Sequence, residues 1–304
     1  MKNNLKIVFF GTPDFAMPVL EALKKNSYNV FHLQQKSLKD ELVFEEFKSL
    51  KPDICIVAAY GKIIPQKFLD IPQFGFINIH PSLLPKYRGP SPIQTAILNE
   101  DQEAGVSIIV MDAEIDHGPL LAKREFSIFN FKFSNHSELA KELFELGAKL
   151  LIETLPKYIA GEIKIKEQDH SQATFTKMFS RDDGRINWNQ PCEKIYNQIR
   201  ALNPEPGTWT MWKGKILNIH ETDIIKEGWP EWACLPARRD PGRVEVSRPN
   251  PSGVRRGQDP GHVIVVATKT CYLILKSIQL EGGKKMDAKS FVNGHPDFLG
   301  SRLE

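Results

Sequence analysis

The hydrophobic positions of the chain up to about residue 125 form short continuous runs that alternate with helical patterns. Continuous apolar runs are typical of strands that are buried on both faces. They predict strands at 5–10, 28–33, 54–59, 76–79 and 107–111, and helices at about 15–26, 38–50 and 93–98. Strands that alternate with helices indicate right-handed crossovers. We therefore expect an α/β fold with a doubly wound, mostly parallel sheet.

The second half of the chain has a different pattern. Apolar residues at helical spacing predict a long helix at 134–159, whereas residues 161–179 have no clear period and are interpreted as a linker. From residue 180 onwards, a predicted helix at 192–201 is followed by short strands at 208–212, 215–220, 262–268 and 271–280. Many short strands with turns between them predict a small, OB-like β-barrel. The expected domains are 1–160 and 180–304.

Composition adds limits to this picture. The 304 residues carry a net charge of +3, which permits an anionic partner without requiring one. The four cysteines are far apart and none lies in a C-x-x-C pair, so we predict neither a zinc site nor a redox pair. The sequence has no apolar run of about 18 residues and no signal-peptide pattern, so we expect no membrane contact and a cytoplasmic protein.

One segment differs from its surroundings. Between Lys226 and Lys269 the chain has six arginines, no lysine and clustered prolines. We interpret residues 227–261 as an Arg/Pro-rich surface insertion. A basic loop that contacts nucleic acid is the alternative interpretation.

Two polar residues end the predicted strand at 76–79. Asn78 and His80 point to the same side because alternate residues of a strand share a face. They lie at the carboxyl end of the strand, where open α/β sheets bind their ligands. A single histidine is more often structural, but the pair at this position is a candidate active site.

Two loops carry further candidate chemistry. Residues 82–89 (SLLPKYRG) form a proline-flanked loop that could hold a flat ligand by its backbone, although a plain surface loop fits as well. Residues 111–119 (MDAEIDHGP) hold several carboxylates beside a histidine, which provides a means of moving protons. In this loop we expect Glu114 to be solvated, and Asp112 could cap a turn.

These motifs resemble the methionyl-tRNA formyltransferase family. The resemblance rests on VFFGTPDFA at 8–16, NxHPSLLPxYRG at 78–89, MDxxxDxG at 111–118, DGRIxW at 183–188 and IRALNPxPG at 199–207. It covers most of the chain. The second and third motifs are shared with other folate-dependent formyltransferases, whereas the first and the last two are more specific to the tRNA enzyme.

The resemblance implies a formyltransferase-type sheet, a tRNA-binding second domain, and formyl transfer from 10-formyltetrahydrofolate to methionyl initiator tRNA during translation initiation. It implies catalytic roles for Asn78, His80 and Asp116. It implies a folate site formed by Ser82, Leu83, Leu84, Pro85, Tyr60, Ile63 and Ile64. As substrate-binding residues we expect Gly11, Thr12, Pro13 and Arg88. No metal is expected, and the predicted state is a monomer.

The sequence departs from the family near residues 30–37. We expect one βα unit and the family's basic loop that approaches the tRNA to be absent there, because the first short strand leads almost directly into the following helix. Two alternatives follow from this departure. One is a formyltransferase that acts on an amino sugar nucleotide or another small amine. The other is a degenerate, non-catalytic copy that binds RNA or folate.

Overall fold

The computed structural model of the chain describes residues 5–34, 37–128, 133–224, 233–234, 240–249 and 263–304. The chain separates into two compact units, each described by itself below. Unit 1 comprises Met1–Phe133 and Ser137–Met178, and unit 2 comprises Ser134–His136 and Phe179–Glu304. Within the described residues, no helix is sufficiently long and apolar to span a membrane.

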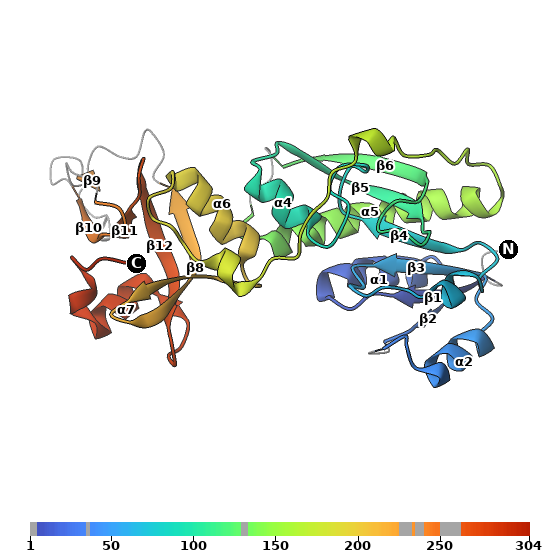
Figure 1. Ribbon diagram of the computed structural model, residues 1–304, viewed down its shortest axis with the longest axis horizontal. Coiled ribbons are helices and arrows are strands. Elements are labelled where there is room, and N and C mark those ends of the chain that lie inside the picture. The colour runs from blue at the N-terminus through green and yellow to red at the C-terminus, as the bar shows by residue number, and fades with distance from the viewer. Residues whose placement is uncertain (1–4, 35–36, 129–132, 225–232, 235–239, 250–262) are drawn as a thin grey trace. The chain divides into compact units, whose positions relative to one another are not determined.

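Unit 1 is built on a six-stranded sheet, counted over the described residues, with strand order β2-β1-β3-β4-β5-β6. The strands are β1 (Lys6–Phe10), β2 (Asn29–His32), β3 (Ile54–Ala58), β4 (Phe76–His80), β5 (Glu103–Val110) and β6 (Leu120–Ser127). The helices are α1 (Met17–Lys25), α2 (Glu41–Ser49), α3 (Gln66–Leu69), α4 (Pro92–Leu98) and α5 (His136–Ile159), with a 3-10 turn at Asp14–Ala16 before α1. Figure 1 shows these elements from blue to yellow-green.

The sheet is mixed, and most of its strands are parallel. The first four strands in spatial order pair in parallel, but β5 runs antiparallel to β4, and β6 runs antiparallel to β5. The expected parallel set is therefore present in four of the six strands, and β5 and β6 extend it in the antiparallel direction. An apolar run marks a buried strand but carries no information on its direction.

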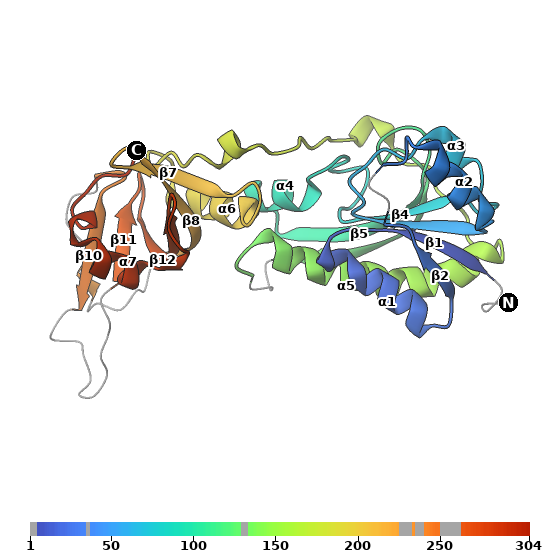
Figure 2. The ribbon, with the colours of Figure 1, turned by 90° about the horizontal axis from the view of Figure 1, so that it is seen from below.

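Helices cover both faces of this sheet, with α1 and α5 on one side and α2 and α3 on the other (Figure 2). Strand alternation divides the core accordingly. Val8, Phe10, Cys55, Val57 and Phe76 form one buried cluster with Val43 and Phe47 of α2 and Phe68 of α3. Asn78 and His80 lie on the same face of β4 as Phe76, because they follow it by two and four residues. The α2–α3 side therefore carries the candidate site.

The segment after α5 stays with unit 1. Lys166 pairs with Leu120 at the start of β6, through backbone N–O distances of 2.8 and 3.0 Å. Phe175 forms an isolated parallel bridge to Arg88. A 3-10 turn, η3 (His170–Gln172), lies between these two contacts. The segment interpreted as a linker thus packs against unit 1 as far as Met178.

Unit 2 contains a separate antiparallel sheet of seven strands within the described residues. Its order is β7-β8-β12-β11-β10-β9, and β13 pairs with β12. The strands are β7 (Thr208–Trp212), β8 (Lys215–Ile224), β9 (Ala233–Cys234), β10 (Val244–Pro249), β11 (Val263–Ala267), β12 (Tyr272–Leu280) and β13 (Met286–Asp287). The helices are α6 (Cys192–Leu202) and α7 (Ala288–Gly294), with 3-10 turns at Arg181–Gly184 and Pro296–Phe298.

The helix and four strands predicted in unit 2 are present as α6, β7, β8, β11 and β12, whereas β9, β10, β13 and α7 were not predicted. Lys213 and Gly214 join β7 to β8 with φ angles of +50° and +73°. Positive φ at both central residues is the geometry of the tight hairpin turn that the sequence predicts there. Ile195 and Ile199 of α6 pack with Leu217 and Ile219 of β8 in the buried core. Most of the Arg/Pro-rich segment at 227–261 lies outside the described residues.

Candidate active site

Asn78, His80 and Asp116 come together in unit 1. The Asn78 amide nitrogen donates to Asp116 Oδ1 at 3.1 Å, and His80 Nδ1 lies 3.5 Å from Asp116 Oδ2. His80 is only 4% exposed. The structure thus brings the three residues into one cluster.

The surroundings of His80 fix where its ring carries a proton. Its Nε2 lies 2.8 Å from the Tyr87 carbonyl oxygen. A carbonyl only accepts, so Nε2 is the N–H that donates to it. The other ring nitrogen then faces a carboxylate oxygen. A proton accepted by the ring would therefore lie between Nδ1 and Asp116 Oδ2.

Asp116 is held by the backbone as well. Its Oδ2 accepts from the Gly89 N–H at 2.8 Å, and its own φ is +49°, in the left-handed region. Aspartate is one of the few residues that adopt this conformation readily. The carboxylate therefore links β4 to the loop that contains Gly89.

The predicted folate loop is held by hydrogen bonds to a residue that the sequence did not indicate. Ser107 of β5 is fully buried, donates to the Ser82 carbonyl at 2.7 Å, and accepts from the Leu84 N–H at 3.0 Å. The Ser82 hydroxyl donates to the Lys86 carbonyl at 2.6 Å, and the Leu84–Pro85 peptide is cis. Leu84 is buried, whereas Leu83 and Pro85 are partly exposed.

The three residues expected to form the wall of the folate site differ in exposure. Tyr60 and Ile64 are 6% and 7% exposed and belong to the core cluster, where Tyr60 packs edge-on against Phe10. Burial raises the pKa of the Tyr60 hydroxyl. Ile63 is 86% exposed.

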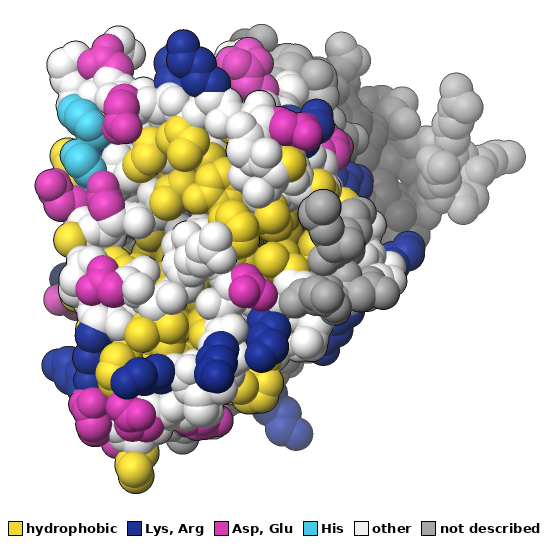
Figure 3. Space-filling view, turned by 90° about the vertical axis from the view of Figure 1, so that its right-hand side faces the viewer, with side chains coloured by type: hydrophobic (Ala, Val, Ile, Leu, Met, Phe, Trp, Pro, Cys, Tyr) yellow, Lys and Arg dark blue, Asp and Glu magenta, His cyan; other side chains and the backbone are white. Residues whose placement is uncertain are grey.

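Exposed apolar side chains gather in unit 1. Figure 3 shows a broad apolar band on one face of the molecule, with a row of Lys and Arg side chains along one border. The large exposed apolar side chains of unit 1 are Phe31, Leu42, Ile63, Ile115, Ile165, Phe175 and Met178.

The expected substrate-binding residues lie in two places. Gly11, Thr12 and Pro13 follow β1 at its carboxyl end, and the Gly11 carbonyl accepts from His32 Nε2 at 2.9 Å. A Cβ on Gly11 would lie 2.9 Å from the Ala58 carbonyl oxygen, so only glycine fits there. Arg88 is 3% exposed and its guanidinium is bonded inside the unit. Its role in binding substrate stays a prediction.

The partners of Arg88 are residues that sequence reasoning missed. Gln168 Oε1 accepts from Arg88 Nε and from a terminal guanidinium nitrogen at 3.2 and 2.9 Å, and His170 Nδ1 accepts at 2.8 Å. The His170 ring stacks on the His117 ring with centroids 4.1 Å apart. His117 Nδ1 in turn lies 2.7 Å from Asp112. No periodic signal marks Gln168 or His170, because Gln168 lies outside regular structure and His170 lies in a 3-10 turn of only three residues.

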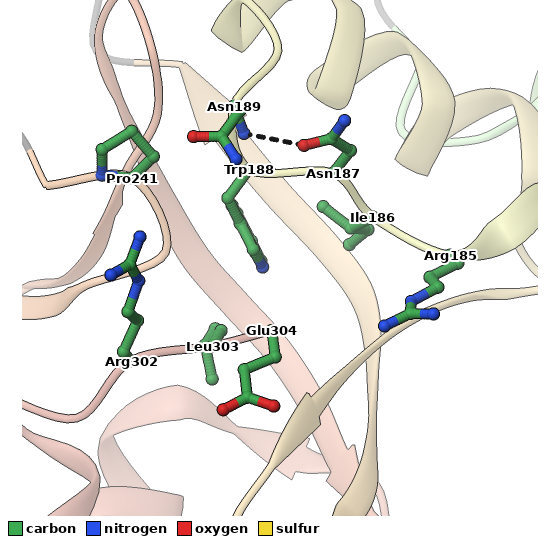
Figure 4. A pocket seen from close by; sticks show the side chains of 9 residues that line it. All are labelled: Arg185, Ile186, Asn187, Trp188, Asn189, Pro241, Arg302, Leu303 and Glu304. Atoms are coloured by element: carbon green, nitrogen blue, oxygen red, sulfur yellow. Dashed lines mark hydrogen bonds between the residues drawn. The ribbon is translucent and has the colours of Figure 1, made fainter.

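Unit 2 holds a separate cavity of about 620 Å³, which none of the predicted site residues lines. Its lining residues are Arg185, Ile186, Asn187, Trp188, Asn189, Pro241, Arg302, Leu303 and Glu304. Figure 4 shows Arg185 and Arg302 on opposite sides of Trp188.

Two cysteines of unit 2 form a contact that their spacing did not predict. Cys192 and Cys271, 79 residues apart in sequence, are joined as a disulfide. Together with Glu193 they are also the group of possible metal ligands found among the described residues, but the disulfide engages both sulfurs. The lack of a C-x-x-C motif gave no sign of this bond, because only the fold brings the start of α6 to the turn before β12.

Comparison with known proteins shows which family the chain resembles. Residues 11–155 match the family described as "Formyl transferase", and residues 178–296 match "Formyl transferase, C-terminal domain". The methionyl-tRNA formyltransferase of Roseiflexus castenholzii is 35% identical over 332 aligned positions that span 99% of each chain. That alignment has 28 more positions than the 304 residues of this chain. At least that many of its positions therefore face gaps here.

Two further similarities agree. The methionyl-tRNA formyltransferase of Roseiflexus sp. (strain RS-1) is 44% identical over 71% of this chain and 66% of the relative, slightly less than two thirds of its length. HypX from Aquifex aeolicus, solved in complex with tetrahydrofolic acid, has a TM-score of 0.74 at 16% identity, over 98% of this chain and 48% of HypX. At that identity the likeness supports the fold alone.

The chain therefore belongs to the formyl transferase family, among relatives that are named methionyl-tRNA formyltransferase. The resemblance inferred from the sequence motifs is confirmed, and the protein is a formyl-transferring enzyme.

Proposed function

We propose that the enzyme transfers the formyl group of 10-formyltetrahydrofolate to the amino group of methionyl initiator tRNA, in the cytoplasm and as a monomer. The observation that carries this proposal is the cluster of Asn78, His80 and Asp116, in which the amide nitrogen and the imidazole lie 3.1 and 3.5 Å from the two oxygens of the carboxylate. The names of the relatives supply the nature of the acceptor.

The chemistry of the step follows from these groups. The free amine of the methionyl ester attacks the formyl carbon, a C–N bond forms, and negative charge develops on the formyl oxygen. The second N–H of the Asn78 amide, which does not point to Asp116, would donate to that oxygen. His80 and Asp116 would take the proton that the attacking nitrogen loses. The bond between carbon and N10 of the folate then breaks, and N10 receives a proton.

The remaining assignments are part of the same proposal. The loop Ser82–Pro85 would hold the folate through its backbone, since Ser107 and Lys86 already fix the shape of the loop. Tyr60, Ile63 and Ile64 would border the pterin. Gly11, Thr12, Pro13 and Arg88 would position the substrate, and no metal takes part. Unit 2, as an OB-like barrel, would bind the tRNA.

The departure near residues 30–37 bears on how the tRNA is held. β2 is an edge strand beside β1, and α2 begins nine residues after β2 ends. The surplus positions in the alignment with the Roseiflexus castenholzii relative support the absence of a unit somewhere in this chain. Arginines of the 227–261 insertion, including Arg238, Arg239, Arg255 and Arg256, would supply phosphate contacts instead. These four residues lie outside the described residues.

The first test uses Asn78→Ala. Removal of one oxyanion donor should lower kcat for formylation of methionyl initiator tRNA by about 10²–10³-fold, with the protein still folded. Formylated methionyl-tRNA is measured after reaction with labelled 10-formyltetrahydrofolate. Asn293→Ala, an exposed asparagine on α7, is the matched control and should behave as wild type.

The same assay separates the alternatives. Wild-type activity on methionyl-tRNA that Asn78→Ala abolishes supports the proposal. Activity that occurs only with an amino sugar nucleotide would indicate a small-amine formyltransferase. An inactive wild-type protein that still binds folate or RNA would indicate a degenerate copy.

A further inference from the structure

The segment at residues 166–176, here called the strap, lies against both loops of the candidate site. At one end Lys166 pairs with Leu120, as described above. At the other end, the Arg88 N–H donates to the Thr174 carbonyl and the Thr176 N–H donates to the Arg88 carbonyl, both at 2.8 Å. The Thr174 hydroxyl oxygen also accepts from the Tyr87 N–H at 2.8 Å. The strap is therefore part of the packed structure of unit 1.

Gln168 of the strap uses its full hydrogen-bonding capacity. Its amide nitrogen donates to the carbonyl oxygens of Asp116 and Gly118 at 2.8 and 2.7 Å, and its amide oxygen accepts twice from Arg88. A glutamine amide has two N–H groups and two oxygen lone pairs, and all four are engaged. The side chain is 4% exposed. Since carbonyls only accept and guanidinium only donates, the amide has one orientation.

The loop that carries Asp116 needs such support because of the direction of β5. Val110, the last residue of β5, lies opposite Ile77, three residues before His80. The loop must therefore reach back along β4 to bring the Asp116 carboxylate to His80. Its base is tight, since a Cβ on Gly118 would lie 1.9 Å from the Val110 carbonyl oxygen. The two bonds from Gln168 hold the loop at Asp116 itself and two residues later.

Gln168 also connects this loop to a buried cation. Arg88 adjoins Gly89, whose N–H donates to the Asp116 carboxylate. A buried guanidinium is costly unless its N–H groups are hydrogen-bonded. Gln168 and His170 together accept three hydrogen bonds from the Arg88 guanidinium. One amide thus fixes the distance between the two loops that meet at Asp116.

We propose that Gln168 is a positioning residue for formyl transfer, which acts by holding Asp116 in place beside Asn78 and His80. This inference rests on the proposed function. It makes the strap a part of the catalytic unit, and it assigns a role to a side chain that touches neither substrate.

Two variants separate the contacts of Gln168. Gln168→Glu keeps the volume and the oxygen that faces Arg88, but it places an oxygen opposite the carbonyls of Asp116 and Gly118. Gln168→Met keeps the approximate length and removes all four bonds. Both should lower kcat by about 10–100-fold with less than about threefold change in KM for folate and tRNA, because a displacement of about 1 Å at a reacting group costs on this scale. Gln172→Met, an exposed glutamine of the same strap, is the control and should leave both constants unchanged.

A double-mutant cycle tests whether Gln168 acts through Asp116. If it does, Gln168→Met should lower kcat by less than about threefold in an Asp116→Ala background, measured in single-turnover reactions. Thermal unfolding confirms that each variant is folded, and Gln168→Glu decides the matter if Gln168→Met does not fold. Folded variants with wild-type kcat, or equal losses in both backgrounds, would overturn the inference while wild-type activity upholds the proposed function. An inactive wild-type enzyme would instead overturn the proposed function, and this inference with it.

Discussion

His220 illustrates how a single side chain couples the stability of unit 2 to pH. It is partly buried on β8, and its Nε2 donates to Gln279 Oε1 at 3.1 Å. Burial lowers the pKa of His220, the nearby charges of Lys285 and Arg181 lower it further, and the bond to Gln279 opposes them. The folded state therefore binds a proton less readily than the unfolded chain, in which a histidine titrates near pH 6.5.

The sign of the pH effect follows from that difference. The contribution of His220 to stability is fully present above about pH 6.5 and is lost as the pH falls towards the lowered folded-state pKa. We expect the fall in the free energy of unfolding between pH 7.5 and 5.5 to be smaller in His220→Gln than in wild type. Denaturant unfolding at both pH values measures it, and an equal fall in both proteins would contradict the assignment.

At the same scale, sequence reasoning found the side chains that its periodicities could orient. Asn78 and His80 were placed on one face because a strand alternates, and the structure has them together with Asp116. Ser107 and Gln168 were not found. Ser107 lies within an apolar strand where a small polar residue carries no signal, and the contacts of Gln168 join residues up to 80 positions apart in sequence.

Among the elements, α5 packs unusually close to the sheet. A Cβ on Gly147 would lie 2.6 Å from a methyl group of Ile79 on β4 and 3.1 Å from one of Val106 on β5. Both neighbours are β-branched and therefore stiff, so they give way poorly. The glycine sets the distance between the helix and the strand that carries Asn78 and His80.

Gly147→Ala should for this reason lower stability, although alanine favours a helix. The gain in helix propensity is about 1 kcal/mol, and the cost of overpacking is about 1–3 kcal/mol. We expect a net loss of roughly 1 kcal/mol, or about 2–4 °C in the melting temperature of a unit of this size. Lys149→Ala, on the exposed side of α5, is the control. A more stable Gly147→Ala protein would show that the helix is not held so close.

The elements also show which strands the hydrophobic pattern of the sequence can predict and which it cannot. The strands at β1, β3 and β4 were predicted because both of their faces are buried. β6 was missed because Lys123, Arg124 and Glu125 give it the polarity of a loop, as expected for a strand with exposed positions. The direction of β5 could not be predicted, because parallel and antiparallel buried strands have the same apolar run. The strap has no period, since it is fixed by individual hydrogen bonds.

For the whole molecule, the Cys192–Cys271 disulfide makes stability depend on the redox conditions. A bridge over 79 residues restricts the unfolded chain of unit 2 and contributes about 2–4 kcal/mol in the usual range. Disulfides rarely persist in a reducing cytoplasm, where we propose that the enzyme acts. The oxidised and reduced enzymes should accordingly differ in stability.

Cys271→Ser should reproduce the effect of reduction. We expect the oxidised wild-type protein to resist denaturant more than the variant, and the two to converge once a phosphine reductant is added. Cys271 is the better position to change because it is partly exposed, whereas Cys192 is fully buried. A reductant that leaves wild-type unfolding unchanged would mean that the bond does not form in solution.

The same disulfide has a consequence for the integrity of the chain. Residues 193–270, which include the whole Arg/Pro-rich insertion at 227–261, lie between the two bonded cysteines. A single peptide-bond cleavage anywhere in that interval would leave the two fragments covalently joined. While oxidised, the enzyme would therefore survive proteolytic nicking of its insertion as one molecule, and only reduction would let β12 and α7 separate from the part that carries the candidate active site.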